Sequence, residues 1–172
     1  MGSTTQDGRY LHIGPAVVSF GSGALEYVYG IEIRPSGTVV RAPGIETSAG
    51  PVDIRVTDRQ LTIYVKDASV LADTVAAATG VASANISVVG SGRRLLPLST
   101  DTSIDKGPAS VSFTRDDGTA CRYLIFRAAK VPMFEAVKHG KSQFAEYAYA
   151  LESLDPANGT NSPWQFEEGA LT

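Results

Sequence analysis

The feature of this sequence that most restricts its fold is the alternation of apolar and polar side chains. In residues 26–35 every second side chain is apolar, the set being Tyr27, Tyr29, Ile31 and Ile33. Residues 51–67 hold two further runs of this kind, Val52, Ile54 and Val56, then Leu61, Ile63 and Val65. A period of two places the apolar side chains of a run on one face of a β-strand. We therefore expect half-buried strands, and we interpret residues 58–60 as the turn of a β-hairpin within 51–67.

Other segments also have the composition of strands, namely residues 15–21, 85–90, 93–99, 109–118 and 120–131. The Asp117-Gly118 pair between the last two favours a hairpin turn. Residues 142–154 fit either a strand or a helix, because apolar side chains recur there both at every second position and at helical spacing. The β-rich surroundings and the tyrosines Tyr147 and Tyr149 favour a strand.

The sequence DASVLADTVAAATG, residues 67–80, predicts one helix. Asp67 or Ser69 can cap its start, and Gly80 ends it. The apolar residues at helical spacing are Val70, Leu71, Val75 and Ala78. A short helix among strands must bury such a stripe against a sheet. The predicted fold class is therefore mainly β, a β-sandwich or barrel with one packed α-helix at about 67–80.

The chain has 172 residues, which is enough for one domain with a sizeable core. No repeat or linker divides it, so we expect a single domain over 1–172 with extended termini. Residues 1–12 are expected to form a flexible N-terminal arm and residues 155–172 a C-terminal tail. A long loop is expected at about 41–51. Residues 42–50 of that loop include two glycines, one proline and a single charge, which is typical either of a slack surface loop or of a segment that lies on a partner.

Charge and hydropathy exclude some classes of function. The net charge of -3 argues against a nucleic-acid-binding protein, which needs a basic surface to displace counterions. No apolar run approaches the ~20 residues of a membrane span. The polar N-terminus lacks the apolar core of a signal peptide, so we expect no export. The single cysteine, Cys121, allows no internal disulfide and fits synthesis in a reducing compartment.

Residue patterns for catalysis or metal binding are not found. The two histidines, His12 and His139, have no partner at metal-ligand spacing. Cys121 lies inside a strand-like run, where a cysteine behaves as a small apolar residue. The tripeptide GSG occurs at 21–23 and at 90–92. Neither copy is followed by the residues of a phosphate-binding loop. We expect no enzyme activity, no cofactor and no metal.

Two charged patterns have a structural and a functional interpretation. The adjacent carboxylates in RDDG (115–118) and FEEG (166–169) fit a hairpin tip and a solvated tail, although the sequence does not exclude a glycosidase pair. Arg93 and Arg94 could contact phosphate or DNA. The acidic net charge instead favours a solvent-facing pair on a strand edge.

Four phrases occur in an order shared with a known family. They are a strand and glycine-bearing hairpin at 13–35, the phrase GIETSAGPVDIRVT at 44–57, a strand running into a helix at 61–80, and a late strand IFRAAKV at 125–131 that leads to an acidic turn. This layout resembles the tail tube (major tail) proteins of long-tailed bacteriophages. The resemblance covers roughly residues 13 to 160 and rests on the order of the phrases more than on any one of them.

The resemblance implies a structural virion protein of a siphovirus tail. It implies homohexameric rings that stack helically into a hollow tube through which genomic DNA is ejected without specific binding. Implied partners are further copies of the chain, the tape measure protein and tail-tip or terminator proteins, with no membrane anchor. The implied location is the virion tail after synthesis in the host cytoplasm. The loop would then contact the next ring, with Arg41, Pro43, Ile45, Glu46 and Pro51 as the expected interface residues.

Two other classes of function remain open from the sequence. One is another tube or ring component, such as a tail terminator, the inner tube of a contractile system or a capsid decoration protein. The other is a β-sandwich carbohydrate-binding module, which needs an exposed aromatic platform. The aromatic residues available for such a platform are Tyr27, Tyr29, Tyr147 and Tyr149.

Overall fold

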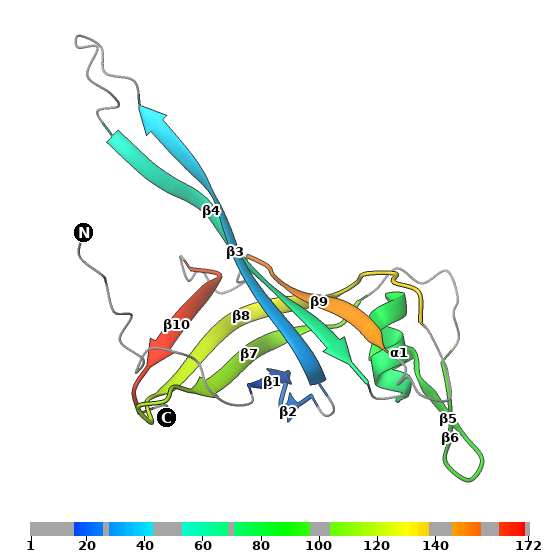
Figure 1. The fold of residues 1–172 in the computed structure, drawn as a ribbon. Helices are drawn as coiled ribbons and strands as arrows, with labels where there is room; N and C mark the ends of the chain where they lie inside the picture. Colours follow the sequence, from blue (N-terminus) through cyan, green and yellow to red (C-terminus); the bar gives the residue numbers. More distant parts are fainter. Residues whose placement is uncertain are drawn as a thin grey trace.

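The structure, a computed structural model, describes residues 16–25, 28–42, 53–68, 71–96, 104–137, 146–155 and 162–170. These ranges are mainly β with one α-helix, as predicted (Figure 1). The main sheet contains β1 (Val17–Phe20), β2 (Gly23–Ala24), β3 (Val28–Ala42), β4 (Asp53–Asp67), β7 (Lys106–Thr114), β8 (Ala120–Pro132), β9 (Tyr147–Ser153) and β10 (Trp164–Glu168). A separate two-stranded sheet pairs β5 (Ser87–Val89) with β6 (Arg93–Leu95).

The main strands form one antiparallel sheet, which does not close into the barrel that the sequence also allowed. Its order is β2-β1-β7-β8-β9-β4-β3, with β10 paired to β8. A single core nevertheless joins the two ends of this order, because Val18 of β1 belongs to the same buried cluster as Leu61 and Ile63 of β4. The other members of the cluster are Val65, Ala77, Ala109, Val111, Ile125, Ala128, Tyr149 and Leu151.

The central strand β8 has two partners along one edge. Its later residues pair with β9, from Ala128 opposite Ser153 to Pro132 opposite Tyr149. Its earlier residues pair with β10, from Trp164 opposite Ile125 to Glu168 opposite Cys121. The strand predicted within 142–154 is thus confirmed as β9. Residues 164–168, by contrast, are a strand within the segment expected to be a C-terminal tail.

The turn predicted at residues 58–60 is wrong. β4 runs unbroken from Asp53 to Asp67 and pairs along its length with β3. The pairing shifts between Ser36–Gln60 and Thr38–Thr57, so one extra residue of β4 is accommodated as a β-bulge. Asp58 takes a left-handed conformation there, with φ 51°, which aspartate tolerates better than most residues.

The bulge explains why the apolar positions change parity along β4. Ile54 and Val56 are even-numbered, whereas Leu61, Ile63 and Val65 are odd-numbered. One extra residue between the two runs keeps both on the same face of the β3–β4 ribbon. A similar shift between Val28 and Gly30 moves Tyr29 out of the expected buried set. Tyr29 is 52% exposed, while Val28 packs against the core.

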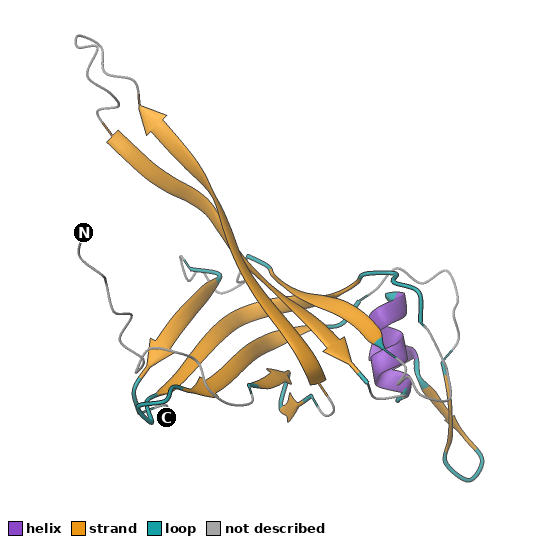
Figure 2. Ribbon diagram, in the orientation of Figure 1, coloured by secondary structure: helices purple, strands orange, loops and turns teal. Residues whose placement is uncertain are grey.

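Helix α1 (Ala72–Thr79) is shorter than predicted and buries a different face. Its N-cap is Leu71 without a side-chain cap, and Asp67 instead ends β4. Ser69 and Val70 lie outside the described residues. The buried side chains are Thr74, Ala76 and Ala77, and they are small enough for the helix to pack closely on β8 and β9 (Figure 2). Gly80 ends the helix as predicted, in a left-handed conformation.

Candidate assembly surface

The β3–β4 ribbon extends far beyond the body of the molecule. We call its distal part, residues 36–42 of β3 and 53–60 of β4, the arm (Figures 1 and 2). Its exposed aliphatic side chains are Val39, Val40, Ile54 and Val56, each between 45% and 57% exposed. Val39 lies directly opposite Val56 on one face, and Val40 lies on the other. The arm therefore presents apolar surface on both faces.

The arm also has unpaired main-chain edges among the described strands. β3 is the last strand of the sheet, and it pairs only with β4 in the part of the chain that is described. β9 accompanies β4 only from Thr62 to Asp67, and the Ser153 hydroxyl accepts the N–H of Leu61 just beyond that pairing. From residue 60 outward, no described strand covers the second edge of β4. Such edges are templates for pairing with another chain.

A cleft of about 540 Å³ lies where the arm leaves the sheet. We call it the fork. One side is formed by Val56, Thr57, Asp58 and Arg59 of β4, and the other by Ser162, Pro163 and Trp164. The residues around the bulge at Asp58 thus form the wall opposite the start of β10. Sequence reasoning missed the fork, because it assigned residues 164–168 to a tail.

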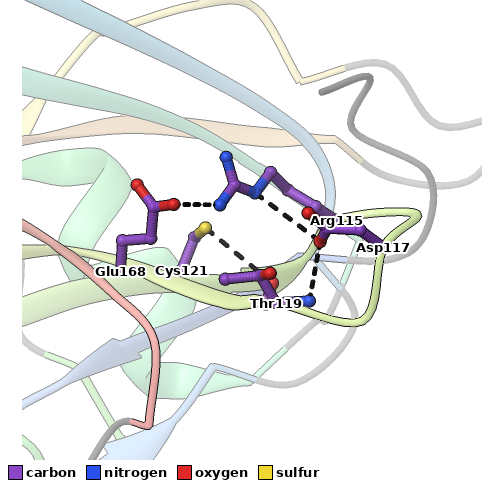
Figure 3. A network of polar contacts seen from close by, with 5 residues as sticks. All are labelled: Arg115, Asp117, Thr119, Cys121 and Glu168. Atoms are coloured by element: carbon purple, nitrogen blue, oxygen red, sulfur yellow. Dashed lines mark hydrogen bonds and ion pairs between the residues drawn. The ribbon is translucent and has the colours of Figure 1, made fainter. Parts of the chain in front are cut away.

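Ion pairs and ring contacts hold β10 firmly in place. Glu167 accepts hydrogen bonds from Arg122, at 2.5 and 2.6 Å. Glu168 pairs with Arg115, beside the hairpin tip where Asp117 accepts the N–H of Thr119 (Figure 3). The Phe166 ring lies 4.9 Å from the Tyr123 ring, centroid to centroid. β10 is thus an anchored strand rather than a loose tail, and these two glutamates have structural partners.

The predicted interface residues fall mostly outside the described ranges. Arg41 is exposed near the end of β3, at the distal end of the arm. Pro43, Ile45, Glu46 and Pro51 lie in residues 43–52, outside the described residues. Their role at an interface therefore stays a prediction.

A buried polar cluster joins β4, β8 and β9 near the helix. The Tyr149 hydroxyl donates to Asp67 at 3.5 Å, and both side chains are buried. The Lys130 ammonium lies 4.4 Å from the Phe20 ring centroid, and burial lowers its pKa. Asp67, Lys130 and Tyr149 also line a cleft of about 280 Å³. The Tyr149–Asp67 hydrogen bond therefore joins the neighbouring strands β9 and β4.

The structure also shows where the other candidate residues from the sequence lie. Cys121 is fully buried, as expected of a small apolar residue. Arg93 and Arg94 lie on the exposed strand β6, as expected, and Arg94 pairs with Asp73 of the helix at 2.8 Å. Tyr147 and Tyr149 are buried, and Tyr27 lies outside the described residues, so the described part of the chain forms no platform from these tyrosines.

Neither histidine lies in a described range. In those ranges no group of three or more His, Cys, Asp or Glu side chains is arranged to hold a metal ion. The described part of the chain also contains no helix that is long and apolar enough to span a membrane.

Comparison with known proteins gives a weak structural likeness. No protein-family model matches this chain, and no curated protein sequence does. Among solved structures, the chain is similar to the anti-feeding prophage cap, a tube-terminating cap determined by cryo-electron microscopy. The sequence identity is 13%, the match covers 97% of this chain and 99% of the cap, and the TM-score is 0.45. A likeness of this size supports no conclusion on its own.

Proposed function

We propose that this protein is a structural subunit that assembles with copies of itself into rings, which stack into the hollow tail tube of a bacteriophage. The observation that carries the proposal is the arm. A two-stranded ribbon is marginally stable in water by itself, and this one exposes four aliphatic side chains on two faces. Fully burying one such side chain contributes about 1.5–3 kcal/mol, so contact with a neighbouring copy would stabilise the arm substantially.

The open sheet supports a ring. Its order ends at β3 on one side and at β2 on the other. Edges of this kind invite uncontrolled pairing unless a partner covers them. Cyclic symmetry lets each copy use the edge of the next and then close, which limits the assembly to a ring. Six copies per ring is the number that the family resemblance implies, and it belongs to the proposal.

The arm is the part proposed to join successive rings. Arg41, Pro43, Ile45, Glu46 and Pro51 are proposed to contact the adjacent ring, since they lie on the arm or on the segment that connects its strands. Tape measure and tail-tip or terminator proteins are proposed as partners at the ends of the tube. The net charge of -3 favours free passage of genomic DNA through the lumen.

Substitutions in the arm test this function. We expect Ile54→Asp to abolish the stacking of rings into tubes and leave folding unchanged, because Ile54 is 57% exposed in the single chain and would be buried between copies. Ile45→Asp is expected to behave in the same way. Ile54→Val is the matched control, because it keeps an apolar β-branched side chain. Sedimentation velocity measures assembly and thermal unfolding measures the fold. Normal assembly of both aspartate variants would contradict the stacking role of the arm.

A further inference from the structure

The outer edge of β10 begins at the fork, because its first residue, Trp164, lines that cleft. Pro163 accepts a hydrogen bond from the N–H of Phe126 opposite it, and Gly169 donates to the carbonyl of Ala120 opposite it. In an antiparallel ladder such bonded pairs alternate with non-bonded pairs. The residues between them that bond to β8 are therefore Gln165 and Glu167. The N–H and C=O groups of Phe166 and Glu168 consequently point away from β8, toward a side where no described strand lies.

Apolar side chains lie along this edge, beside the outward main-chain groups. Phe166 is 45% exposed although its ring contacts Tyr123. Trp164 and Pro163 form an apolar wall on one side of the fork. Val56 adds an apolar side chain to the opposite wall. Unpaired main-chain groups beside apolar pockets are the features by which proteins bind an added β-strand.

We propose that the fork and the outer edge of β10 receive the arm of a second copy, with the outer edge of its β3 pairing to β10. This inference rests on the proposed function and names the surface on which the stacking arm docks. The arm of the same molecule cannot fill the fork, because its own β4 residues form one side of it. The outer edge of β3 in the arm has no partner among the described strands, so it can supply main-chain groups to the outer edge of β10.

The first test uses proline to remove an outward N–H. Phe166→Pro deletes a donor that does not bond to β8, and an edge strand tolerates proline at such a position. We expect this variant to fold and to lose assembly. Phe166→Val is the matched control, since it also lacks the ring but keeps the N–H, and we expect it to assemble. Assembly of Phe166→Pro at the wild-type level would overturn the proposal.

The second test identifies the occupant by disulfide cross-linking. Two proteins of different tagged mass are mixed, one carrying Phe166→Cys and the other Val39→Cys or Val40→Cys, under mild oxidation. The native Cys121 is fully buried, so background linkage is low. We expect a mixed disulfide dimer that exceeds the dimers formed by either protein alone. Rings or tubes without this mixed dimer would overturn the docking surface and leave the proposed function standing. The absence of any assembly would overturn both.

The single tryptophan gives an independent signal. Trp164 lines the fork and is partly exposed in one chain. We expect its fluorescence emission to shift to shorter wavelength when the protein assembles. A shift in the Ile54→Asp variant, which is expected not to stack into tubes, or an unchanged spectrum in wild-type tubes would contradict occupation of the fork.

Discussion

Gly80 combines two constraints at one residue. Its φ of 74° is left-handed, and an added Cβ would lie 2.9 Å from Cγ of Pro132 at the end of β8. We expect Gly80→Ala to lower the free energy of unfolding by about 2–4 kcal/mol, from the conformational cost and the clash together. Gly90→Ala is the control, since Gly90 has a similar φ of 61° and no atom within 4 Å. Equal losses in urea unfolding for the two variants would contradict the close packing of the helix end on Pro132.

The buried phenol of Tyr149 predicts a loss of stability in alkali. Burial raises the pKa of this hydroxyl, and the Asp67 carboxylate raises it further. The unfolded chain releases the proton near pH 10, where the folded chain still holds it. The contribution of Tyr149 is therefore complete below about pH 10 and is lost as the pH rises above it. Burial lowers the pKa of Lys130, which acts with the opposite sign.

Tyr149→Phe separates these two effects, because Lys130 remains in both proteins. We expect the free energy of unfolding to fall less steeply with pH in the variant than in the wild type between about pH 10 and 11. Urea titrations at a series of pH values measure the two slopes. Parallel curves would show that Tyr149 keeps an ordinary pKa in the folded protein.

At the scale of elements, the sequence predicted strands better than it predicted their connections. Alternation located β3, because a half-buried strand needs that pattern, and strand-like composition located β1, β7, β8 and β9. The apolar positions change from even-numbered to odd-numbered between Val56 and Leu61. We interpreted this change as a turn, but a bulge produces it while the strand continues. The helix was correctly placed before Gly80. Its buried face was not, because close packing on the sheet selected small side chains over Leu71 and Val75.

The sequence predicted the contact segment at the end of the arm but not the fork. The segment after β3, with its single charge, indicated contact with a partner, and in the sequence it lies between the two strands of the arm. The fork depends on where β10 pairs, and five residues after a turn-rich stretch carry no clear periodic signal. The Arg115–Glu168 and Arg122–Glu167 pairs that hold β10 join residues 53 and 45 positions apart. Pairing at that distance cannot be inferred from one sequence.

At the scale of the whole molecule, the fold is an open sheet with surfaces suited to neighbours. The arm extends from one end, and the β5–β6 hairpin extends from the opposite end beside the helix (Figure 1). Val88, Val89 and Leu95 are exposed on that hairpin. A chain that leaves apolar side chains and strand edges uncovered at separate places is suited to repeated contacts between copies. Rings that form without stacking would favour a tube terminator over a tube subunit.

Copies of this chain are proposed to build a tube, and negative-stain electron microscopy of the purified protein at high concentration shows whether they do. We expect stacked rings or hollow tubes in the wild type, and dispersed particles in Ile54→Asp. Wild-type protein that stays as dispersed monomers at the highest attainable concentration, with a monomer mass by sedimentation, would contradict it.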